Sequence, residues 1–456
     1  MKPNRHTLSF LICIFLLFSL SFTVDAEPIH RTFRYSDGGV TFKYTLKNGK
    51  AAIMDIEAIK NKSKVITFPE RVLNPYSSNI GYPVTEVRYW AEEFTDFDTE
   101  SGGGFYLDKV KVVLPEGYLT VGDGAFRGDK ITDIQLPDSL EAINKFAFEG
   151  SAITELNIPA NVSQIGDAAF ANCKKLKKVT LSPDNGHYLL MDHFLVERDS
   201  MKALAYFGPG GKVQVPEGIQ EIAPYALDNG KKITRLSLPA SLEQLSPGFV
   251  HNSHIDTVLL AEDNRHFTLE DGVLLSADRG TLVFYPHARR GKSYATPDGV
   301  HTVVSRVFTG LRNLKELTLS PQVRVVDDRA CEQPEGSSLR VSIQGQIESV
   351  GMFAFSRCTM DKVLTLPGSL RSMGYGAFYE TKFQELILSE GIEEIAPYAF
   401  AWVKGLKKVS LPSTMKALPS RAFFACASLE EVQGLEHIQD LGNAFKSCDK
   451  LKLPPR

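Results

Sequence analysis

The side chains of this chain that could do chemistry are chiefly its cysteines, and four of them share one position in a repeated motif. Cys173, Cys358, Cys426 and Cys448 each stand three residues after the phenylalanine of an Ala-Phe pair. Cysteines of exported proteins form disulfides and clustered cysteines bind zinc, but the sequence contains no Cys-x-x-Cys pair. A fixed place in a repeat is typical of small buried side chains. We therefore expect free thiols, even at Cys426 and Cys448 in neighbouring units, and no metal site.

Histidines and acidic residues form no arrangement typical of an active site. His251 and His254 stand near each other without an acidic partner at a telling spacing. Asp96, Asp98 and Glu100 resemble a calcium-binding loop, but the closing acidic residue and the turn glycine are misplaced, so we expect a solvated acidic loop. The sequence has no nucleophile-elbow, zinc-protease or phosphate-loop pattern. It therefore predicts no catalytic residue, metal or cofactor, and a protein that is not an enzyme.

Two other kinds of chemistry stay open as alternatives. Aromatic rings can stack on sugars, which makes a non-catalytic glycan-binding protein the second hypothesis, although packing is the commoner role of such rings. The rings concerned are Trp90, Trp402, Tyr188, Tyr206 and Tyr285. Paired carboxylates can hydrolyse glycosidic bonds. A hydrolase that uses acids such as Glu197 or Asp271 is the third and least favoured hypothesis.

A repeated unit must position all these residues, and Ile153–Cys173 shows it most clearly. Leu156 and Ile158 lie two residues apart, so in a strand they point one way while Glu155 and Asn157 point the other way. The proline that follows ends the strand, because it has no N–H to donate. A unit this short cannot bury its apolar face alone, so neighbouring units must stack on it.

The Ala-Phe position of the unit recurs mostly every 22 to 24 residues, a period in the leucine-rich-repeat range. We expect these residues to stack as a continuous internal spine. They are Phe126, Phe148, Phe170, Leu227, Phe249, Phe308, Cys331, Phe355, Phe378, Phe400, Phe423 and Phe445. Two intervals are more than twice as long, and their sequences resemble each other. Each long unit is predicted to carry a β-hairpin insert, near residues 187–207 and 266–285.

The run of Leu-Pro, Ile-Gly, Ala-Phe and Cys, as in LNIPANVSQIGDAAFANC and LTLPGSLRSMGYGAF, resembles the BspA-like leucine-rich repeat family from about Val65 to the end. The resemblance implies an α/β-type solenoid, a right-handed leucine-rich repeat of mostly short parallel β-strands with turn or short-helix returns. Family members are mostly secreted or surface proteins of bacteria, and the better-known ones take part in adhesion to host proteins or other cells. Such repeats are general binding scaffolds, so the resemblance specifies the fold more than the function.

The order of the chain predicts three parts. Residues 1–26 have the positive start, apolar run and small-residue site of a secretory signal peptide; a membrane anchor is the alternative, but the apolar run is at the short limit for a span. Thr32–Leu46 alternates around Asp37-Gly38-Gly39 and predicts a β-hairpin, so residues 27–64 are expected to form a β-rich cap on the solenoid of residues 65–456. Cleavage would remove two positive charges and one negative charge, taking the formal net charge from −3 to −4. That balance offers no basic surface for nucleic acid. We expect a mature chain without a transmembrane span, secreted or on the cell surface, and a monomer.

The outward strand positions predict the binding surface. In a leucine-rich repeat they face the concave side, where a broad polar surface of mixed charge suits a protein partner. Leu259 and Ile387 are apolar where their neighbours are polar, so they are either binding hot spots or residues covered by the inserts. The candidate residues are Glu155, Asn157, Lys178, Thr180, Arg235, Ser237, Leu259, Glu316, Thr318, Arg340, Ser342, Thr365, Ile387 and Lys408. We expect the partner to be a host matrix or cell-surface protein.

Overall fold

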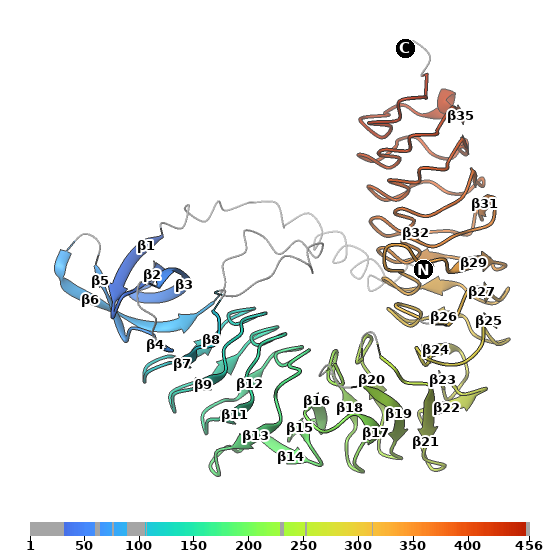
Figure 1. The fold of residues 1–456 in the computed structure, drawn as a ribbon. Coiled ribbons are helices and arrows are strands. Elements are labelled where there is room, and N and C mark those ends of the chain that lie inside the picture. Colours follow the sequence, from blue (N-terminus) through green and yellow to red (C-terminus); the bar gives the residue numbers. More distant parts are fainter. Residues whose placement is uncertain are drawn as a thin grey trace, which may run out of the picture.

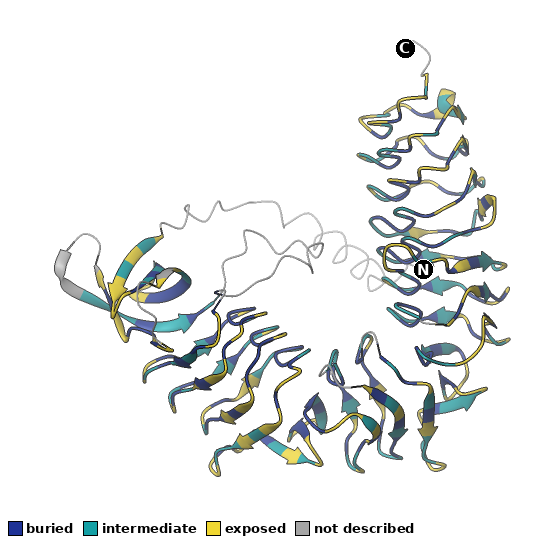
Figure 2. Cartoon of the chain, in the orientation of Figure 1, coloured by how far each residue is buried: buried dark blue, intermediate teal, exposed yellow. Residues whose placement is uncertain are grey.

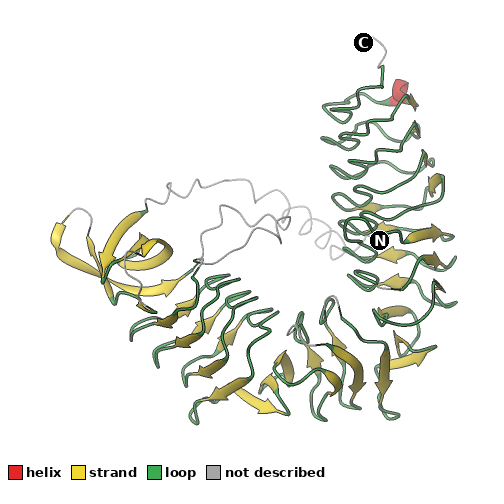
Figure 3. Cartoon of the chain, in the orientation of Figure 1, coloured by secondary structure: helices red, strands yellow, loops and turns green. Residues whose placement is uncertain are grey.

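The computed structural model describes residues 32–59, 64–74, 77–88, 105, 107–228, 232–250, 253–311 and 313–452. The predicted signal peptide, the acidic loop at 95–104, Trp90 and His251 lie outside the described residues. Within the described residues the chain consists of strands and turns, apart from one short 3-10 turn, η1 (Leu435–His437), drawn in red in Figure 3.

Most strands belong to two parallel ladders that follow the length of the chain (Figure 1). The outer ladder contains the strands of the Leu-Pro motif. These are β4 (Val65–Thr67), β7 (Lys111–Val113), β9 (Asp133–Gln135), β11 (Glu155–Ile158), β13 (Lys178–Leu181), β17 (Gly211–Gln214), β19 (Ile233–Leu238), β21 (Thr257–Leu260), β25 (Ser293–Ala295), β27 (Glu316–Leu319), β29 (Arg340–Ile343), β31 (Val363–Leu366), β33 (Glu385–Leu388), β34 (Lys408–Ser410) and β35 (Glu431–Gln433).

The inner ladder consists mainly of two-residue strands about half a unit further along the chain. Its members are β6 (Ser77–Val87), β8 (Thr120–Val121), β10 (Ala142–Ile143), β12 (Gln164–Ile165), β18 (Glu221–Ile222), β20 (Gln244–Leu245), β26 (Thr302–Val303), β28 (Val325–Val326), β30 (Ser349–Val350) and β32 (Ser372–Met373). Many neighbouring units thus hydrogen-bond along two edges, as in β11 with β13 and β10 with β12.

The predicted inward and outward alternation is present in β11. Leu156 and Ile158 are buried, whereas Glu155 and Asn157 are exposed. Figure 2 shows the same alternation of buried and exposed residues along the units of all three runs. The apolar face of each strand is therefore covered by the neighbouring units, as a stacked repeat requires.

The expectation of an α/β solenoid with helical returns is wrong: the structure is a β-solenoid. The backbone of the returns explains the difference. Two residues before and two after the spine position, the chain takes a left-handed conformation, with φ of 58° at Ala168 and 56° at Asn172. Phe146 and Ser447 occupy such positions in other units, with φ of 56° and 63°. Left-handed residues cannot continue a right-handed helix, so each return is a series of tight turns.

The phenylalanine spine exists but is not continuous. Phe355, Phe378, Phe400, Phe423 and Phe445 stack with ring centroids 5.1 to 5.4 Å apart, nearly parallel. A second stack joins Phe126, Phe148 and Phe170. Between these stacks the long units interrupt the column. In regular units the N–H of the spine residue donates to the carbonyl of the alanine that precedes the next spine residue, as Phe148 does to Ala169. Here the Leu227 N–H donates to the Phe249 carbonyl. Phe249 therefore takes the alanine position, and Val250 takes the spine position.

Each long unit forms a three-stranded antiparallel meander rather than a simple hairpin. The strands are β14 (Tyr188–Met191), β15 (Phe194–Glu197) and β16 (Lys202–Tyr206) in one, and β22 (Phe267–Glu270), β23 (Val273–Ser276) and β24 (Thr281–Phe284) in the other. The third strand of each meander, β16 or β24, starts the next section of the inner ladder by pairing with β18 or β26. Both ladders break at the meanders, and the buried residues form three separate cores, so the molecule has three runs of units. The outer ladder has further breaks between β9 and β11 and between β29 and β31.

The meanders are also partitions between hydrophobic cores. Leu195 packs into the core of the first run, whereas Phe194 and Val196 on either side of it pack into the core of the middle run. In β23, Val273 and Leu275 face the last run while Leu274 faces the middle run. Because alternate residues of a strand point to opposite faces, a strand with three successive apolar residues can close two cores at once.

The N-terminal sheet lies at the open end of the first run. It contains β1 (Phe33–Asp37), β2 (Val40–Lys47) and β3 (Lys50–Ile59), with β5 (Arg71–Asn74) paired to β6. β3 runs parallel to β6, and β6 to β8, so this sheet continues directly into the inner ladder. Phe42 of β2 packs on Phe68 with centroids 5.3 Å apart, and Phe68 meets Phe126 at 6.1 Å. The sheet thereby covers the first rings of the spine.

Candidate binding surface

The outward residues of the outer ladder lie in register and form two columns along each run. Glu155 stands beside Lys178, and Asn157 beside Thr180. The other candidates follow the same pairing, with Arg235 beside Thr257, Ser237 beside Leu259, Glu316 beside Arg340, Thr318 beside Ser342, Thr365 beside Ile387 and Lys408 beside Glu385. Every candidate is exposed or half-buried, so all of them are available on one surface.

Several of these side chains already pair with one another. Lys178 Nζ lies 3.2 Å from Glu155 Oε2, and the Thr180 hydroxyl donates to Asn157 Oδ1 at 2.9 Å. The Ser342 hydroxyl donates to Asp361 at 3.1 Å. Exposed ion pairs of this kind contribute only about 0–1 kcal/mol each. A partner can therefore exchange them for its own contacts at small cost.

The position of this surface differs from the expected concave side. In Figure 1 the labelled strands β7, β11, β13, β21, β25, β27 and β31 lie along the outside of the bent molecule, and β8, β18, β20 and β32 lie nearer its inside. A leucine-rich repeat with helical returns curves toward its strands, because helices need about 10 Å of spacing and strands only about 4.8 Å. The returns here are turns and short strands, which removes that cause of curvature.

Three apolar side chains stand out on the outer ladder. Val65 in β4 is 47% exposed, Leu259 in β21 is 46% exposed and Val363 in β31 is 42% exposed, whereas Ile387 in β33 is half-buried. Exposed apolar residues among polar ones are typical hot-spot positions. Val363 was missed as a site residue, although a valine in an otherwise polar column is a signal that the sequence contains.

A second column follows the turns of the last run and was also missed. Tyr375 stacks on Tyr398 with centroids 5.0 Å apart, and the Arg421 guanidinium lies 5.6 Å from the Tyr398 ring centroid. Arg329 lies in the same way over Phe353, at 5.2 Å. The sequence signal is the residue two before the spine position, which is aromatic or arginine at Arg329, Phe353, Tyr398 and Arg421, whereas Tyr375 stands three before Phe378. Cation–π contacts of this kind hold successive turns together.

The buried cysteines have a structural role in the returns. All five described cysteines are buried free thiols. Four of them donate S–H to the carbonyl of the spine residue in the previous unit, at 2.9 to 3.2 Å, as Cys173 does to Phe148. The four are Cys173, Cys358, Cys426 and Cys448. In another unit the Thr381 hydroxyl makes the same bond, to Phe355. Burial raises the pKa of the Cys173 thiol to about 12, which keeps the donor proton in place.

An asparagine anchors each meander, and sequence reasoning missed both. The Asn185 side-chain amide donates to the carbonyls of Pro159 and Val162, and its oxygen accepts from the amides of His187 and Tyr188. Asn264 makes the equivalent bonds in the second meander. The shared Asp-Asn-x-His sequence of the two long units is the signal for this anchor.

The residues proposed for sugar stacking or hydrolysis do not converge on a site. Tyr188, Tyr206 and Tyr285 are at most 5% exposed, so they belong to the core and offer no ring face to a sugar. Glu197 accepts a hydrogen bond from Ser200, and Asp271 pairs with Arg289. These two acids lie in different meanders, and each has a separate local partner.

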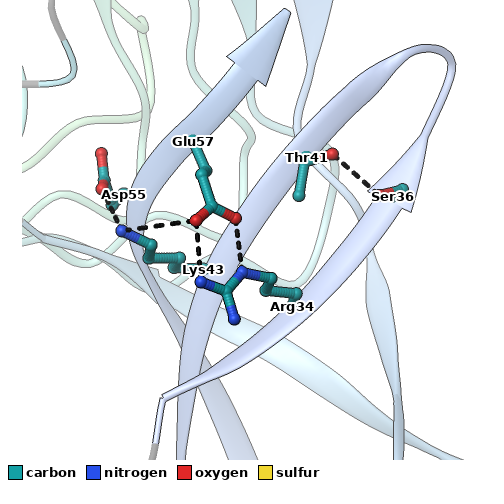
Figure 4. Close-up of polar contacts among 6 residues, drawn as sticks. All are labelled: Arg34, Ser36, Thr41, Lys43, Asp55 and Glu57. Atoms are coloured by element: carbon teal, nitrogen blue, oxygen red, sulfur yellow. Dashed lines mark hydrogen bonds and ion pairs between the residues drawn. The ribbon is translucent and has the colours of Figure 1, made fainter.

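The exposed face of the N-terminal sheet carries a compact charged cluster (Figure 4). Lys43 of β2 lies 3.1 Å from Asp55 and 4.0 Å from Glu57, both on β3. Arg34 of β1 donates to both carboxylate oxygens of Glu57, at 2.5 and 2.8 Å. The charges of this face therefore largely neutralise one another across three strands.

Two acids with raised pKa values lie where the first run meets the middle run. Burial, together with the neighbouring Glu149 carboxylate and against the effect of Lys174, raises the pKa of Asp228 to about 7. Burial also raises the pKa of Glu149, against the effect of Arg127, whose Nε lies 2.7 Å from Glu149 Oε2. Desolvation is the main cause of both raised pKa values, because burial disfavours the charged form of a carboxyl group.

A hollow of about 570 Å³ opens on the last run, between its turns and its outer ladder. Elsewhere the described residues contain no group of three or more His, Cys, Asp or Glu side chains placed to hold a metal ion. The helices among the described residues include none that is long and apolar enough to cross a membrane.

Comparison with solved structures finds several bacterial proteins. The pneumococcal vaccine antigen PcpA is 21% identical, with a TM-score of 0.38 and coverage of 91% of this chain and 89% of PcpA. A leucine-rich repeat protein of Eubacterium ventriosum is 16% identical, with a TM-score of 0.47 and coverage of 93% and 96%. A leucine rich cell surface protein of Faecalibacterium prausnitzii is 18% identical, with a TM-score of 0.34 and coverage of 91% and 98%.

Comparison with curated proteins finds no match. Comparison with family models finds one family, described as the BspA type leucine rich repeat region, in six copies. These copies cover residues 105–192, 203–270 and 336–452, which is more than half of the chain.

Proposed function

The chain belongs to the BspA-type leucine-rich repeat family, and from this premise we propose that it is an extracellular or cell-surface protein that binds another protein through its outer ladder. Leucine-rich repeats generally serve as protein-binding scaffolds without catalysis, and we infer the same for this chain. The predicted signal peptide at residues 1–26 supports export. The role that we propose for this binding is adhesion to a host matrix or cell-surface protein.

The observation that carries the proposal is the exposure of Leu259 and Val363 among mainly polar neighbours in the middle and last runs of the outer ladder. A broad polar surface with a few apolar anchors is the usual composition of a protein interface. A glycan site needs a flat aromatic face. The three meander tyrosines are buried, and Lys404 Nζ lies 5.5 Å from the ring centroid of the exposed Trp402. The geometry therefore favours a protein over a glycan.

The test is binding of the chain from Glu27 onward to purified extracellular-matrix proteins, beside a glycan array. We expect binding to at least one protein of the panel and no glycan signal. The double variant Leu259→Glu with Val363→Glu should lose that binding. Leu190→Glu is the matched control, because Leu190 is 42% exposed but belongs to the first meander. Glycan binding alone, or equal losses in both variants, would refute the proposal.

A further inference from the structure

The hollow on the last run is lined by four successive units. Its walls come from residues 335–340, 357–362, 380–384 and 402–405. Stacked strands are about 4.8 Å apart, so four units span about 14 Å, which matches about four residues of extended chain. The hollow is therefore long enough to take a short extended segment.

Its lining is strongly cationic in a chain whose formal net charge is −3. Arg357 and Glu380 neutralise each other, with Arg357 Nε 2.7 Å from Glu380 Oε2. Within the described part of the chain no carboxylate lies within 4 Å of the charged atoms of the remaining cations, and Glu335 is the one acid left in the lining. Those cations are Arg340, Lys362, Lys382 and Lys404. Together they would attract a ligand with several negative charges.

The backbone adds a second, independent observation. Two residues after the spine position the chain is left-handed, and other units place a small residue or asparagine there: Gly128, Gly150, Asn172, Gly310, Ala425 and Ser447. Three successive units instead carry Arg357, Glu380 and Trp402, at φ of 62°, 54° and 60°. Large side chains are strained in this region, where glycine and asparagine fit best. All three line the hollow. Phe146, Arg329 and Tyr398 are left-handed elsewhere in the returns, so what distinguishes the three residues is the large side chain that each adds to one wall of the hollow.

Trp402 gives the hollow an apolar anchor. It is 37% exposed, its ring meets Phe424 at 5.9 Å, and Lys404 Nζ lies 5.5 Å from its centroid. The other aromatic residue of the lining, Phe383, is buried. A sugar site would need an open ring face, whereas here the ammonium of Lys404 occupies one side of the ring. A tryptophan beside lysines suits a peptide that alternates acidic and apolar side chains.

We propose that this hollow binds an extended acidic segment of a protein partner, with its carboxylates on Lys362, Lys382, Lys404 and Arg340 and an apolar side chain against Trp402. The inference rests on the proposed function in one respect, that the ligand is part of a protein. The hollow adjoins the outer ladder and shares Arg340 with it, but Leu259 and Val363 are not among its lining residues. The proposal of binding through Leu259 and Val363 and the proposal of peptide binding in the hollow can therefore be refuted separately.

The test measures fluorescence anisotropy of a labelled octapeptide of alternating glutamate and leucine with the purified chain. We expect binding that weakens as salt is added, and none with the matching glutamine and leucine peptide. The double variant Lys382→Glu with Lys404→Glu should reduce the affinity about tenfold or more, since two charge-assisted contacts become repulsive. Trp402→Ala should reduce it as well, while Trp402→Phe should restore part of the loss.

The matched control is Lys212→Glu with Lys232→Glu, two exposed lysines outside the hollow that give the same change in net charge. Circular dichroism establishes that each variant is folded. Absence of peptide binding, equal losses in the two double variants, or an unchanged affinity in Trp402→Ala would overturn the proposal. Binding of polygalacturonate instead of the peptide would overturn it in favour of an acidic polysaccharide. Capture of a matrix protein through Leu259 and Val363 would stand in each of these cases.

Discussion

At the scale of single residues, the returns depend on side chains that satisfy buried carbonyl groups. Cys358 donates to the carbonyl of Cys331 at 3.0 Å, and both residues are fully buried. An unsatisfied buried carbonyl is costly, because water cannot reach it. The recurrence of cysteine in this position thus reflects a small buried donor rather than disulfide or metal chemistry.

Removal of this donor should destabilise the last run. Cys358→Ala is expected to lower the free energy of unfolding by about 0.5–1.5 kcal/mol, since the Cys331 carbonyl loses one of its two hydrogen bonds and keeps only the one from Gln333 Nε2 at 3.0 Å. Cys358→Thr should cost less, because Thr381 makes the equivalent bond in the next unit. Urea unfolding followed by circular dichroism measures both. If threonine is as harmful as alanine, the hydrogen bond is not what the position requires.

The pKa of Asp228 predicts a pH dependence of stability. Its pKa is about 7 in the folded protein and about 3.9 in an unfolded chain. Between these values the folded state binds more protons than the unfolded state, so stability should fall as the pH rises from about 4 to 7 and then level off. Asp228→Asn should flatten this slope and raise the melting temperature at pH 8. A wild-type melting temperature that rises over the same range, or an unchanged slope in the variant, would contradict the assignment.

At the scale of elements, the meanders decide how the runs join. Each contributes a strand that is apolar on both faces, with Leu195 in the core of the first run and Val196 in the core of the middle run. Both residues have no exposed surface. Neighbouring residues of one strand therefore stabilise different parts of the molecule.

Alanine substitutions at these two positions should separate the two cores. Leu195→Ala should cost about 2–5 kcal/mol and increase amide exchange chiefly in residues 107–181. Val196→Ala removes fewer atoms, so it should cost less and act chiefly on residues 211–245. Hydrogen exchange with mass spectrometry resolves the two regions. Identical exchange patterns for both variants would show that the meander does not divide the core.

The repeat itself could be predicted from the sequence because Leu156 and Ile158 alternate with polar residues and the Ala-Phe position recurs with a fixed period. The absence of helix in the described returns could not, because single residues such as Phe146 or Arg357 give no sign that they adopt left-handed φ values. The break in the spine at Val250 also escaped prediction, since Phe249 stands one position away and is buried too. The columns of the outer ladder followed from strand alternation. Whether these columns lie on the convex or the concave side of the molecule depends on how much space the returns need compared with the strands. Strand alternation alone does not specify this.

At the scale of the whole molecule, stability should be local. Each unit contacts only its neighbours, and Phe378 stacks between Phe355 and Phe400. Phe378→Ala should therefore cost about 3–5 kcal/mol and raise amide exchange around residues 355–400. Residues 107–181 should keep their protection. Uniform loss of protection along the chain would mean that the solenoid unfolds as one unit instead.

Binding through the outer ladder is tested most directly by photocrosslinking to the matrix protein captured by the chain. A photoreactive phenylalanine analogue is placed at Leu259 on the outer ladder, at Gln164 on the inner ladder, or at Leu190 in the first meander. We predict a crosslink to the partner from position 259 and none from positions 164 and 190. A crosslink from position 164 or 190 with none from position 259 would place the partner on a different face and contradict the proposal.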